Sequence, residues 1–491
     1  MNIHSLLLFV SISCLFIQLQ AQYDVSGVKT AIANLQADPD MKSANWSICI
    51  KDVQTGKTIA AHQDSRSLST ASTMKIITTA TALAMLGGDF RFKTDIAYSG
   101  RIESGVLKGN LYIRGSGDPT LGSERFEAEE HIDKLMLRWV DKIKAVGIQK
   151  IEGQVIADAS IYGTQLNPGN WSWEDMGNYY GAGACGLNIN ENKYRLDFAP
   201  GTYAGGHTKV LRTEPYIHGL TFINEVRTGA RGSGDNAYIY GAPYTYLRYL
   251  RGTIPPAGRV FSIYGSMPDP GLFCAQYLAK LLDSCGIQVA GASSIRVDAL
   301  AGKKHEAKRK TIFEHSSPNL RTIIEPLNMK SINIYAEALC KQLAANEGKT
   351  GTTKKGVKVI LDYWKGQGVN TQGMFVTDGS GLSRSNAMTT SQMAHILAKA
   401  HQASYGKDLY NSLPLAGRSG SLKNMLKGTG AEGNLRAKSG YIGGVRAYAG
   451  YVDTRSGKRL SFAVISNNYS CSAARMRQKL ARLMASLANI P

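Results

Sequence analysis

Acidic side chains are scarce in this chain of 491 residues. Its 37 Asp and Glu stand against 57 Lys and Arg, which gives a formal net charge of +20. The basic residues are spread along the chain, without a basic stripe interleaved with aromatics, so we expect no nucleic-acid partner. The charge fits either an ordinary basic surface, which we favour, or attraction to an anionic extracellular polymer or membrane surface.

Patterns that bind metals are also missing. The nine His residues show no ligand spacing, and the six Cys residues after position 22 are too widely spaced for a C-x-x-C site. Cys274 and Cys285 flank a predicted helix and would stand roughly 16 Å apart, too far for a disulfide. We therefore predict no metal and no cofactor, and we expect most cysteines to be small buried apolar side chains.

Long apolar runs are absent except for one at the N-terminus, from Ser5 to Leu19. A run of about 15 residues is short for a membrane span but typical of a secretory signal. We predict a signal peptide over residues 1–21, a mature chain that begins near Gln22, and no membrane-spanning segment after signal removal. A retained membrane anchor is the alternative, because no Lys or Arg precedes the run and Leu19 is bulky for its place near the cleavage point.

Both ends of the chain contain strands that could belong to one sheet. Apolar strands flank polar turns at 53–56 and 454–457. Between about 89 and 310, short strands alternate with turns rich in Gly, Pro, Asn and Tyr, and only two clear helices are expected, near 127–145 and 271–284. The sequence therefore predicts an α/β domain split by a mostly β insertion.

The segment from Ser67 to Gly88 contains a single charged residue, Lys75. Its small and apolar residues predict a buried helix, and a lysine there must lose its charge, find a partner or do chemistry. Ser72 lies three residues earlier, so the two side chains share a helix face. Such a pair can combine a hydroxyl nucleophile with an amine whose pKa is lowered by burial. The alternative is that Ser72 only caps the helix.

Two further groups contain residue types that suit such chemistry. Ser331 and Asn333 lie at a tight turn between two predicted helices, where Ser331 could relay a proton and the Asn333 amide could bind a substrate carbonyl. A helix cap is the alternative here too. Lys438-Ser439-Gly440 precedes strand-rich sequence, and a strand edge offers backbone N–H groups, a cation and close approach of substrate. Lys349-Thr350-Gly351 has a similar pattern but lies in a polar turn, so we expect Lys349 to be solvated.

The three groups occur in the order typical of the penicilloyl serine transferases. The chain resembles the D-alanyl-D-alanine carboxypeptidase/endopeptidase family of the penicillin-binding protein 4 type, the class C low-molecular-mass penicillin-binding proteins, from about residue 25 to the end. Besides the three groups, the matching stretches are Gly115–Leu121, Gly177–Ala184, Asn328–Asn333, Asp378–Arg384 and Gly428–Gly440.

The resemblance implies an α/β (α+β) fold: a β-lactamase/transpeptidase-like serine acyltransferase domain, with a sheet flanked by helices, split by a two-part insertion. It implies a periplasmic enzyme with peptidoglycan stem peptides and cross-links as substrates and β-lactam antibiotics as covalent inhibitors. The expected divisions are the signal peptide 1–21, the catalytic domain 22–88 and 311–491, inserted domain II 89–165 and 262–310, and inserted domain III 166–261.

The resemblance also assigns roles to the site residues. Ser72, Lys75, Ser331, Asn333 and Lys438 are expected to be catalytic, and Ser439, Gly440 and Tyr441 to bind substrate, with the oxyanion held by the backbone N–H groups of Ser72 and Tyr441. Which lysine is the general base stays open, although a nearby Lys438 is expected to help lower the pKa of Lys75. The alternatives are a serine β-lactamase or esterase on the same fold, and a catalytically idle wall-binding protein.

Overall fold

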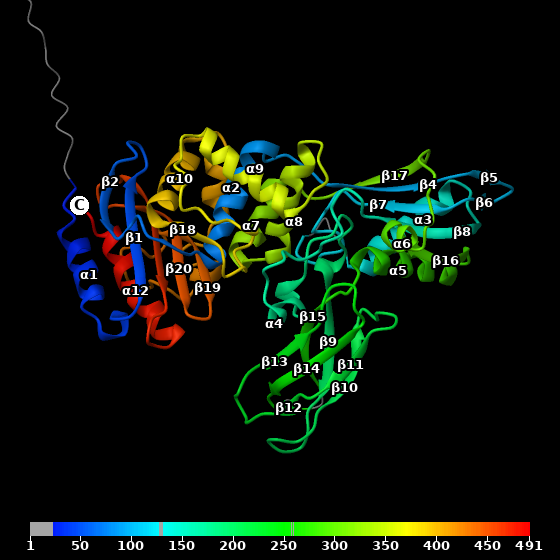
Figure 1. Cartoon of the computed structure of the whole chain (residues 1–491), viewed down its shortest axis with the longest axis horizontal. Helices are drawn as coiled ribbons and strands as arrows, with labels where there is room; N and C mark the ends of the chain where they lie inside the picture. The colour runs from blue at the N-terminus through cyan, green and yellow to red at the C-terminus, as the bar shows by residue number, and fades with distance from the viewer. Residues whose placement is uncertain (1–22, 127–130, 257, 259) are drawn as a thin grey trace, which may run out of the picture.

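The computed structural model describes residues 23–126, 131–256, 258 and 260–491, so the predicted signal peptide lies outside the described residues. Two parts of the chain form an elongated body, and a third part projects from one side of it (Figure 1). Three groups of strands with their helices account for this shape. Within the described ranges, no helix is both long enough and apolar enough to cross a membrane.

The first sheet joins the two ends of the chain. Its strand order is β19-β20-β21-β1-β2, all antiparallel, with bounds β1 (Asn45–Asp52), β2 (Thr58–His62), β19 (Arg436–Ile442), β20 (Val445–Asp453) and β21 (Arg459–Asn467). The burial of β1 and β21 is almost continuous along each strand, as expected when both faces of a sheet are covered.

Helices cover both faces of this sheet (Figure 1). Phe462 and Val464 of β21 pack with α1 (Ser26–Gln36) and α12 (Ala473–Ala488), whereas Ala463 between them belongs to the core on the opposite face. That second core contains the helices that carry or surround the predicted site. They are α2 (Met74–Leu86), α7 (Leu320–Lys330), α8 (Asn333–Asn346), α9 (Thr353–Gly366), α10 (Thr390–Gln402) and α11 (Gly406–Ser412).

The residues between α2 and α7 build the other two parts, mainly from strands. The second part is a seven-stranded sheet of β4 (Lys93–Tyr98), β5 (Arg101–Glu103), β6 (Val106–Lys108), β7 (Leu111–Arg114), β8 (Lys150–Asp158), β16 (Gln288–Ser294) and β17 (Lys310–Ser316), with α3 (Ile132–Ala145), α5 (Pro270–Ser284) and α6 (Ile295–Leu300). The third part holds β9 (Lys193–Ala199), β10 (Lys209–Glu214), β11 (Thr221–Asn224), β12 (Arg227–Thr228), β13 (Asn236–Tyr240), β14 (Leu247–Ile254) and β15 (Phe261–Ser266). The short helices α4 (Trp173–Met176) and α6 were not predicted.

Strand pairing disagrees with two of the expected domain boundaries. β17 pairs with β4, so residues up to Ser316 lie in the second sheet, although the expected boundary was at 310. β15 pairs with β9, so residues up to Ser266 belong with the third part, although the expected boundary was at 261. Pairing partners lie many residues away in the chain, and local composition does not reveal them. The division into domains stays a prediction, with these two boundaries moved to strand ends.

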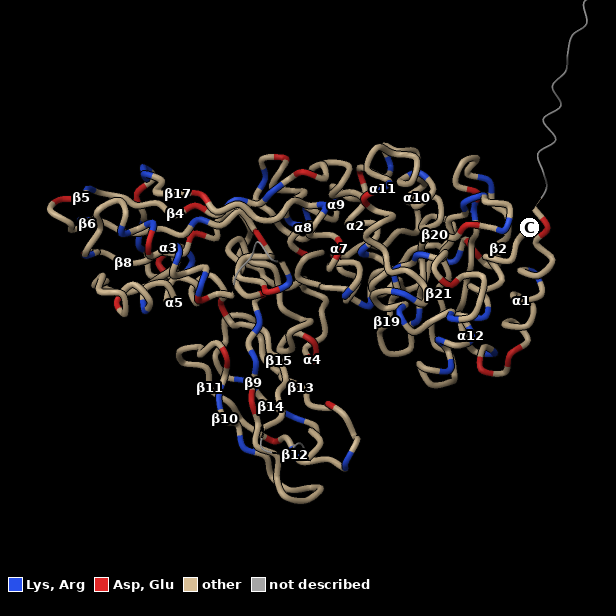
Figure 2. Tube along the Cα trace, turned by 180° about the vertical axis from the view of Figure 1, so that it is seen from behind, with Lys and Arg blue, Asp and Glu red and all other residues tan. Residues whose placement is uncertain are grey.

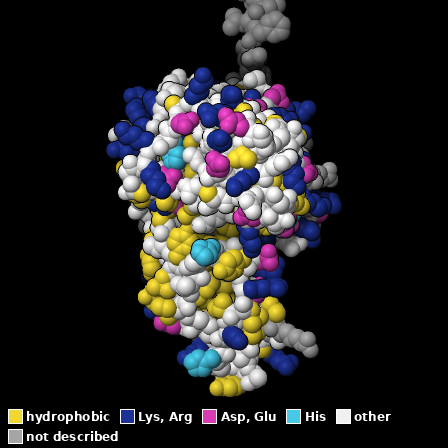
Figure 3. Space-filling view, turned by 90° about the vertical axis from the view of Figure 1, so that its right-hand side faces the viewer, with side chains coloured by type: hydrophobic (Ala, Val, Ile, Leu, Met, Phe, Trp, Pro, Cys, Tyr) yellow, Lys and Arg dark blue, Asp and Glu magenta, His cyan; other side chains and the backbone are white. Residues whose placement is uncertain are grey.

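The surface differs between the three parts. Lys and Arg are distributed along the whole chain and form no single stripe (Figure 2). Large apolar side chains are exposed on the third part, among them Leu211, Tyr216, Ile223 and Leu247. Figure 3 shows apolar side chains gathered on this lower part of the molecule, whereas charged side chains dominate the upper part.

Candidate active site

Ser72 lies where strand β3 (Ser67–Ser69) gives way to helix α2. The short 3₁₀ helix Ala71–Thr73 makes this turn, and Ala71 takes a left-handed backbone conformation with φ of 43°. The Ser72 hydroxyl does not cap the helix; it accepts a hydrogen bond from Lys75 Nζ at 3.0 Å. The structure thus brings the two predicted residues together as a hydroxyl–amine pair.

Lys75 is completely buried, and its amine is held by three oxygen atoms. Besides the Ser72 hydroxyl, it donates to Asn333 Oδ1 at 2.6 Å and to the Ser380 carbonyl at 2.7 Å. Burial lowers the pKa of Lys75 to about 7, although the carboxylates of Asp378 and Glu337 oppose this change. Near neutral pH, a large fraction of Lys75 is therefore uncharged. A neutral amine keeps only two N–H groups, so its lone pair can then accept the proton of the Ser72 hydroxyl.

Ser331 and Asn333 lie at the junction of α7 and α8. Ser331 ends α7 in a left-handed conformation, and its hydroxyl accepts from Lys438 Nζ at 2.9 Å. Asn333 begins α8; its Oδ1 accepts from Lys75 and its Nδ2 donates to the Tyr180 carbonyl at 2.7 Å. The N-cap residue of α8 is Ile332, and no side chain forms a capping hydrogen bond there. Neither Ser331 nor Asn333 therefore caps α8.

Lys438, Ser439 and Gly440 lie on β19, beside the Ser72 turn. Lys438 is buried, and its amine donates to Ser331 Oγ and, at 2.8 Å, to the Ser439 carbonyl. The Ser439 hydroxyl bonds with that of Ser421 at 2.8 Å. A Cβ at Gly440 would come within 2.8 Å of the Thr70 carbonyl oxygen and 3.2 Å of the Ser72 nitrogen, so only glycine leaves that amide open.

Lys438 is buried close to the amine of Lys75. Burial, and then the nearby charge of Lys75, hold the pKa of Lys438 well below its usual range. The lowered pKa of Lys75, by contrast, is caused by burial. The expectation that Lys438 helps to lower the pKa of Lys75 stays a prediction.

Tyr441, the last of the predicted site residues, has an exposed side chain. Its ring is 54% exposed and lies under the guanidinium of Arg446, 4.4 Å from the ring centroid. The bulky ring therefore lies at the surface and not among the buried side chains of the site.

Two buried carboxylates behind Lys75, those of Glu337 and Asp378, were not predicted as part of the site. Glu337 Oε1 accepts from the backbone nitrogens of Gly379 and Ser380, at 3.0 and 2.8 Å. Asp378 Oδ1 accepts from the Gly381 nitrogen at 2.7 Å. These bonds hold the loop so that the Ser380 carbonyl faces Lys75. A charged residue within the apolar stretch of α8 was the available signal for Glu337.

The insertion also contacts α8 through a buried lysine. Lys341 Nζ donates to the carbonyls of Gln165, Leu166 and Ala184, at 2.8, 3.0 and 2.7 Å. Burial lowers the pKa of Lys341, and the Glu337 carboxylate opposes this effect. Residues of the insertion thus complete the hydrogen bonds of a helix that contributes Asn333 to the site.

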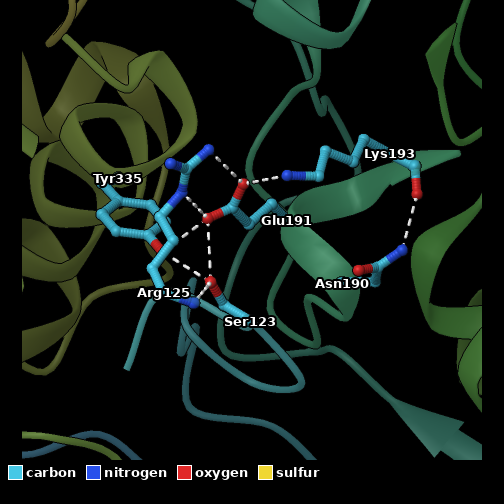
Figure 4. A network of polar contacts seen from close by, with 6 residues as sticks. All are labelled: Ser123, Arg125, Asn190, Glu191, Lys193 and Tyr335. Atoms are coloured by element: carbon cyan, nitrogen blue, oxygen red, sulfur yellow. Dashed lines mark hydrogen bonds and ion pairs between the residues drawn. The ribbon is translucent and has the colours of Figure 1, made fainter. Parts of the chain in front are cut away.

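A second contact of this kind surrounds Glu191 (Figure 4). Its buried carboxylate accepts from Arg125 Nε at 2.6 Å, Lys193 Nζ at 2.5 Å, Ser123 Oγ at 2.9 Å and the Tyr335 hydroxyl at 2.8 Å. Burial alone would raise the pKa of Glu191, but the two cations lower it to about 2. Tyr335 lies two residues after Asn333, so this network ties the insertion to the start of α8.

The cysteines are not among the site residues described above. The six cysteines of the described residues are unbridged, and four of them are buried. In the same part of the chain, no three His, Cys, Asp or Glu side chains are grouped so that they could hold a metal ion.

Known proteins resemble this chain over most of its length. The family model described as D-Ala-D-Ala carboxypeptidase 3 (S13) family matches residues 28–489. A D-alanyl-D-alanine carboxypeptidase from Actinomadura sp. (strain R39) is 28% identical over 445 residues, which cover 88% of this chain and 79% of the relative. The D-alanyl-D-alanine carboxypeptidase DacB of Haemophilus influenzae is 22% identical over 90% of this chain and 89% of its own length.

The fold is also similar to a solved structure. The crystal structure of penicillin binding protein 4 (dacB) from Haemophilus influenzae has a TM-score of 0.78 at 21% identity and covers 94% of this chain and 98% of that one. This likeness confirms the predicted fold class. The family match confirms the predicted family and enzyme class. The chain belongs to the D-Ala-D-Ala carboxypeptidase 3 (S13) family of serine carboxypeptidases.

Proposed function

We propose that this carboxypeptidase works through an acyl-enzyme on Ser72, with neutral Lys75 as its general base. The observation that carries the proposal is the 3.0 Å hydrogen bond between the Ser72 hydroxyl and a buried amine whose pKa is about 7. A hydroxyl is a weak nucleophile until an adjacent base accepts its proton, and this amine has the position and the basicity for that task.

In the acylation step, Ser72 Oγ attacks the carbonyl carbon of the penultimate D-Ala while its proton passes to Lys75. The oxyanion accepts hydrogen bonds from the backbone N–H groups of Ser72 and Tyr441, an arrangement supported by the space that Gly440 leaves beside the Ser72 nitrogen. As the C–N bond breaks, Ser331 donates its proton to the leaving amine. Water then attacks the ester carbonyl and loses a proton, which replaces the one given to the leaving amine. The C–O bond breaks, the shortened peptide leaves, and Lys75 returns its proton to Ser72 Oγ.

Lys438 and Ser439 bind the substrate carboxylate in this proposal. Lys438 donates to Ser331, so it can also replace the proton that Ser331 gives away. Its pKa is low in the free enzyme, but an opposite charge favours the protonated amine. Binding of the carboxylate therefore charges Lys438. Asn333 binds the acyl-side amide, for which its Nδ2 must exchange or share its bond to the Tyr180 carbonyl.

The proposed substrates are peptidoglycan stem peptides and cross-links, which requires export of the chain to the periplasm by its predicted signal peptide. β-Lactams should acylate Ser72, because they present a strained amide beside a carboxylate. A related structure, penicillin binding protein 4 of Haemophilus influenzae, is complexed with a β-lactam; it is 20% identical with a TM-score of 0.74 and covers 94% of this chain and 98% of its own.

The test is covalent labelling with a tagged penicillin. We expect label on the wild-type protein and none on the Ser72→Ala variant. Ser404→Ala is the matched control, because Ser404 begins another Ser-x-x-Lys sequence, Ser404-Tyr405-Gly406-Lys407, and is exposed. Absence of label from the wild type, or equal labelling of Ser72→Ala, would contradict the proposal. Fast release of hydrolysed penicillin would instead indicate a β-lactamase.

Natural substrates separate the two peptidase activities. Purified protein is incubated with cross-linked and uncross-linked muropeptides, and the products are weighed by mass spectrometry. Loss of one alanine from monomers indicates carboxypeptidase activity, and conversion of dimers to monomers indicates endopeptidase activity. If neither substrate changes while penicillin still labels Ser72, peptidoglycan is the wrong substrate.

A further inference from the structure

A cavity of 840 Å³ lies beside the catalytic cluster, and none of the eight predicted site residues lines it. It follows the outward face of α7 toward the insertion. Ligand sites for molecules much larger than one amino acid have volumes of about 300–1,000 Å³. A single released D-Ala would fill only a small part of this space.

Two edges of the cavity are formed by residues that lie next to the site in the chain. Lys330 lines the cavity and is followed in the chain by Ser331, the proposed donor to the leaving amine. Ser419 and Gly420 line another edge, and the next residue, Ser421, bonds with Ser439. The cavity therefore begins where the leaving part of a substrate and its carboxylate would lie.

The charges around the cavity favour an acidic ligand. Arg91, Arg125 and Lys330 line it from three separate segments. The charge of Arg125 is paired with Glu191, so Arg91 and Lys330 are the cations that face a ligand, against one lining carboxylate, Glu325. Arg125 is held in place by its two hydrogen bonds to Glu191 (Figure 4), and Arg91 by a bond to the Ser317 carbonyl at 2.7 Å. Fixed cations that converge on one cavity attract carboxylates and steer them toward it.

We propose that this cavity binds the leaving-side stem peptide of a peptidoglycan cross-link, through the free carboxylates of that peptide. The inference rests on the proposed function and extends it to the endopeptidase substrate. The chemistry is unchanged: Ser72 attacks the same D-Ala carbonyl, the C–N bond breaks, and Ser331 protonates the released amine. Here that amine belongs to a whole peptide, which occupies the cavity instead of a lone D-Ala.

The test compares cross-linked dimers with monomeric pentapeptides on the same variants. For the double variant Arg91→Gln/Lys330→Gln, we expect KM for the dimer to rise about tenfold. The variant loses two exposed ion pairs between the enzyme and the carboxylates of the bound peptide. Cleavage of the pentapeptide and acylation by penicillin should change by less than twofold. Glu325→Gln removes the opposing charge and should lower KM for the dimer about twofold.

Controls keep the result interpretable. Lys365→Gln removes an exposed charge from α9, which does not line the cavity. It should leave KM unchanged for both the dimer and the pentapeptide. Arg91→Gln alone leaves Lys330, the neighbour of Ser331, unchanged. It should give a smaller rise in KM for the dimer than the double variant. Equal losses on dimer and pentapeptide, or no change on either, would overturn the cavity assignment. Failure of the proposed function itself would appear separately, as a wild-type protein that penicillin does not label.

Discussion

In the proposed mechanism, burial of Lys75 makes acylation of Ser72 depend on pH in a defined way. With a pKa of about 7, the neutral fraction of Lys75 is about 0.01 at pH 5, about 0.09 at pH 6 and about 0.5 at pH 7. Only neutral lysine accepts the Ser72 proton. The acylation rate constant should therefore rise about ninefold from pH 5 to 6, about fivefold from pH 6 to 7, and about twofold more before it levels off near pH 9.

The size of the effect follows from the comparison with an unperturbed lysine. With an ordinary pKa of 10.5, only about 3 in 10,000 lysines would be neutral at pH 7, so burial increases the available base about 10³-fold. Arginine keeps its proton in proteins. Lys75→Arg should therefore lower the acylation rate at pH 7 by about 10³-fold or more and remove the rise between pH 5 and 7.

The assay measures the rate of labelling by a tagged penicillin from pH 5 to 9. Lys365→Arg, the same substitution at an exposed position of α9, is the control and should follow the wild-type profile. A wild-type rate that climbs tenfold per pH unit through pH 9 would refute a pKa near 7. A Lys75→Arg variant with the wild-type profile would show that Lys75 is not the base, and Lys438 would then be the remaining amine.

Three further changes should have distinct effects. Between about pH 7 and 10.5, Lys75 is neutral in the native state but protonated in the unfolded state. Its contribution to the unfolding free energy therefore rises in that window by about 1.4 kcal/mol per pH unit. Lys75→Met should lose this contribution in urea titrations at several pH values. Gly440→Ala places a methyl group 2.8 Å from the Thr70 carbonyl, so penicillin acylation should fall at least about tenfold, at a cost of about 1–3 kcal/mol measurable by thermal melting. Unchanged acylation would contradict the close approach at β19. Glu191→Gln leaves Arg125 facing an amide and should cost about 3 kcal/mol in unfolding free energy, whereas a cost below about 0.5 kcal/mol would contradict a buried network.

Local patterns in the sequence were enough to predict that Ser72 and Lys75 lie together. A single lysine in an apolar helix, with a serine three residues before it, identified Ser72 and Lys75 because their contact is set by helix geometry alone. The structure places them at 3.0 Å. Ser331, Asn333 and Lys438 lie far away in the chain, and only the order of the motifs associated them with that pair. Their roles stay predictions until the variants are measured.

The supporting residues could not be predicted in the same way. Glu337 and Asp378 act through a loop whose position depends on how α8 and that loop pack together. The Tyr180 carbonyl, which accepts from Asn333, is a backbone group, and no residue type signals its role. The two domain boundaries that were moved have a similar cause. β15 and β17 belong to their sheets because they pair with β9 and β4, strands that precede them by many residues.

Helix α8 links these supporting contacts to the catalytic side chains. Asn333, Glu337 and Lys341 are spaced four residues apart, so they share one face of the helix. The first bonds to Lys75, the second holds the loop that presents the Ser380 carbonyl, and the third is bonded by the insertion. A buried polar group without a hydrogen-bond partner is costly, so each of these groups constrains its partners strongly. The insertion is therefore part of what fixes Asn333 against Lys75, and a change that loosens it should alter acylation at Ser72 without touching the site.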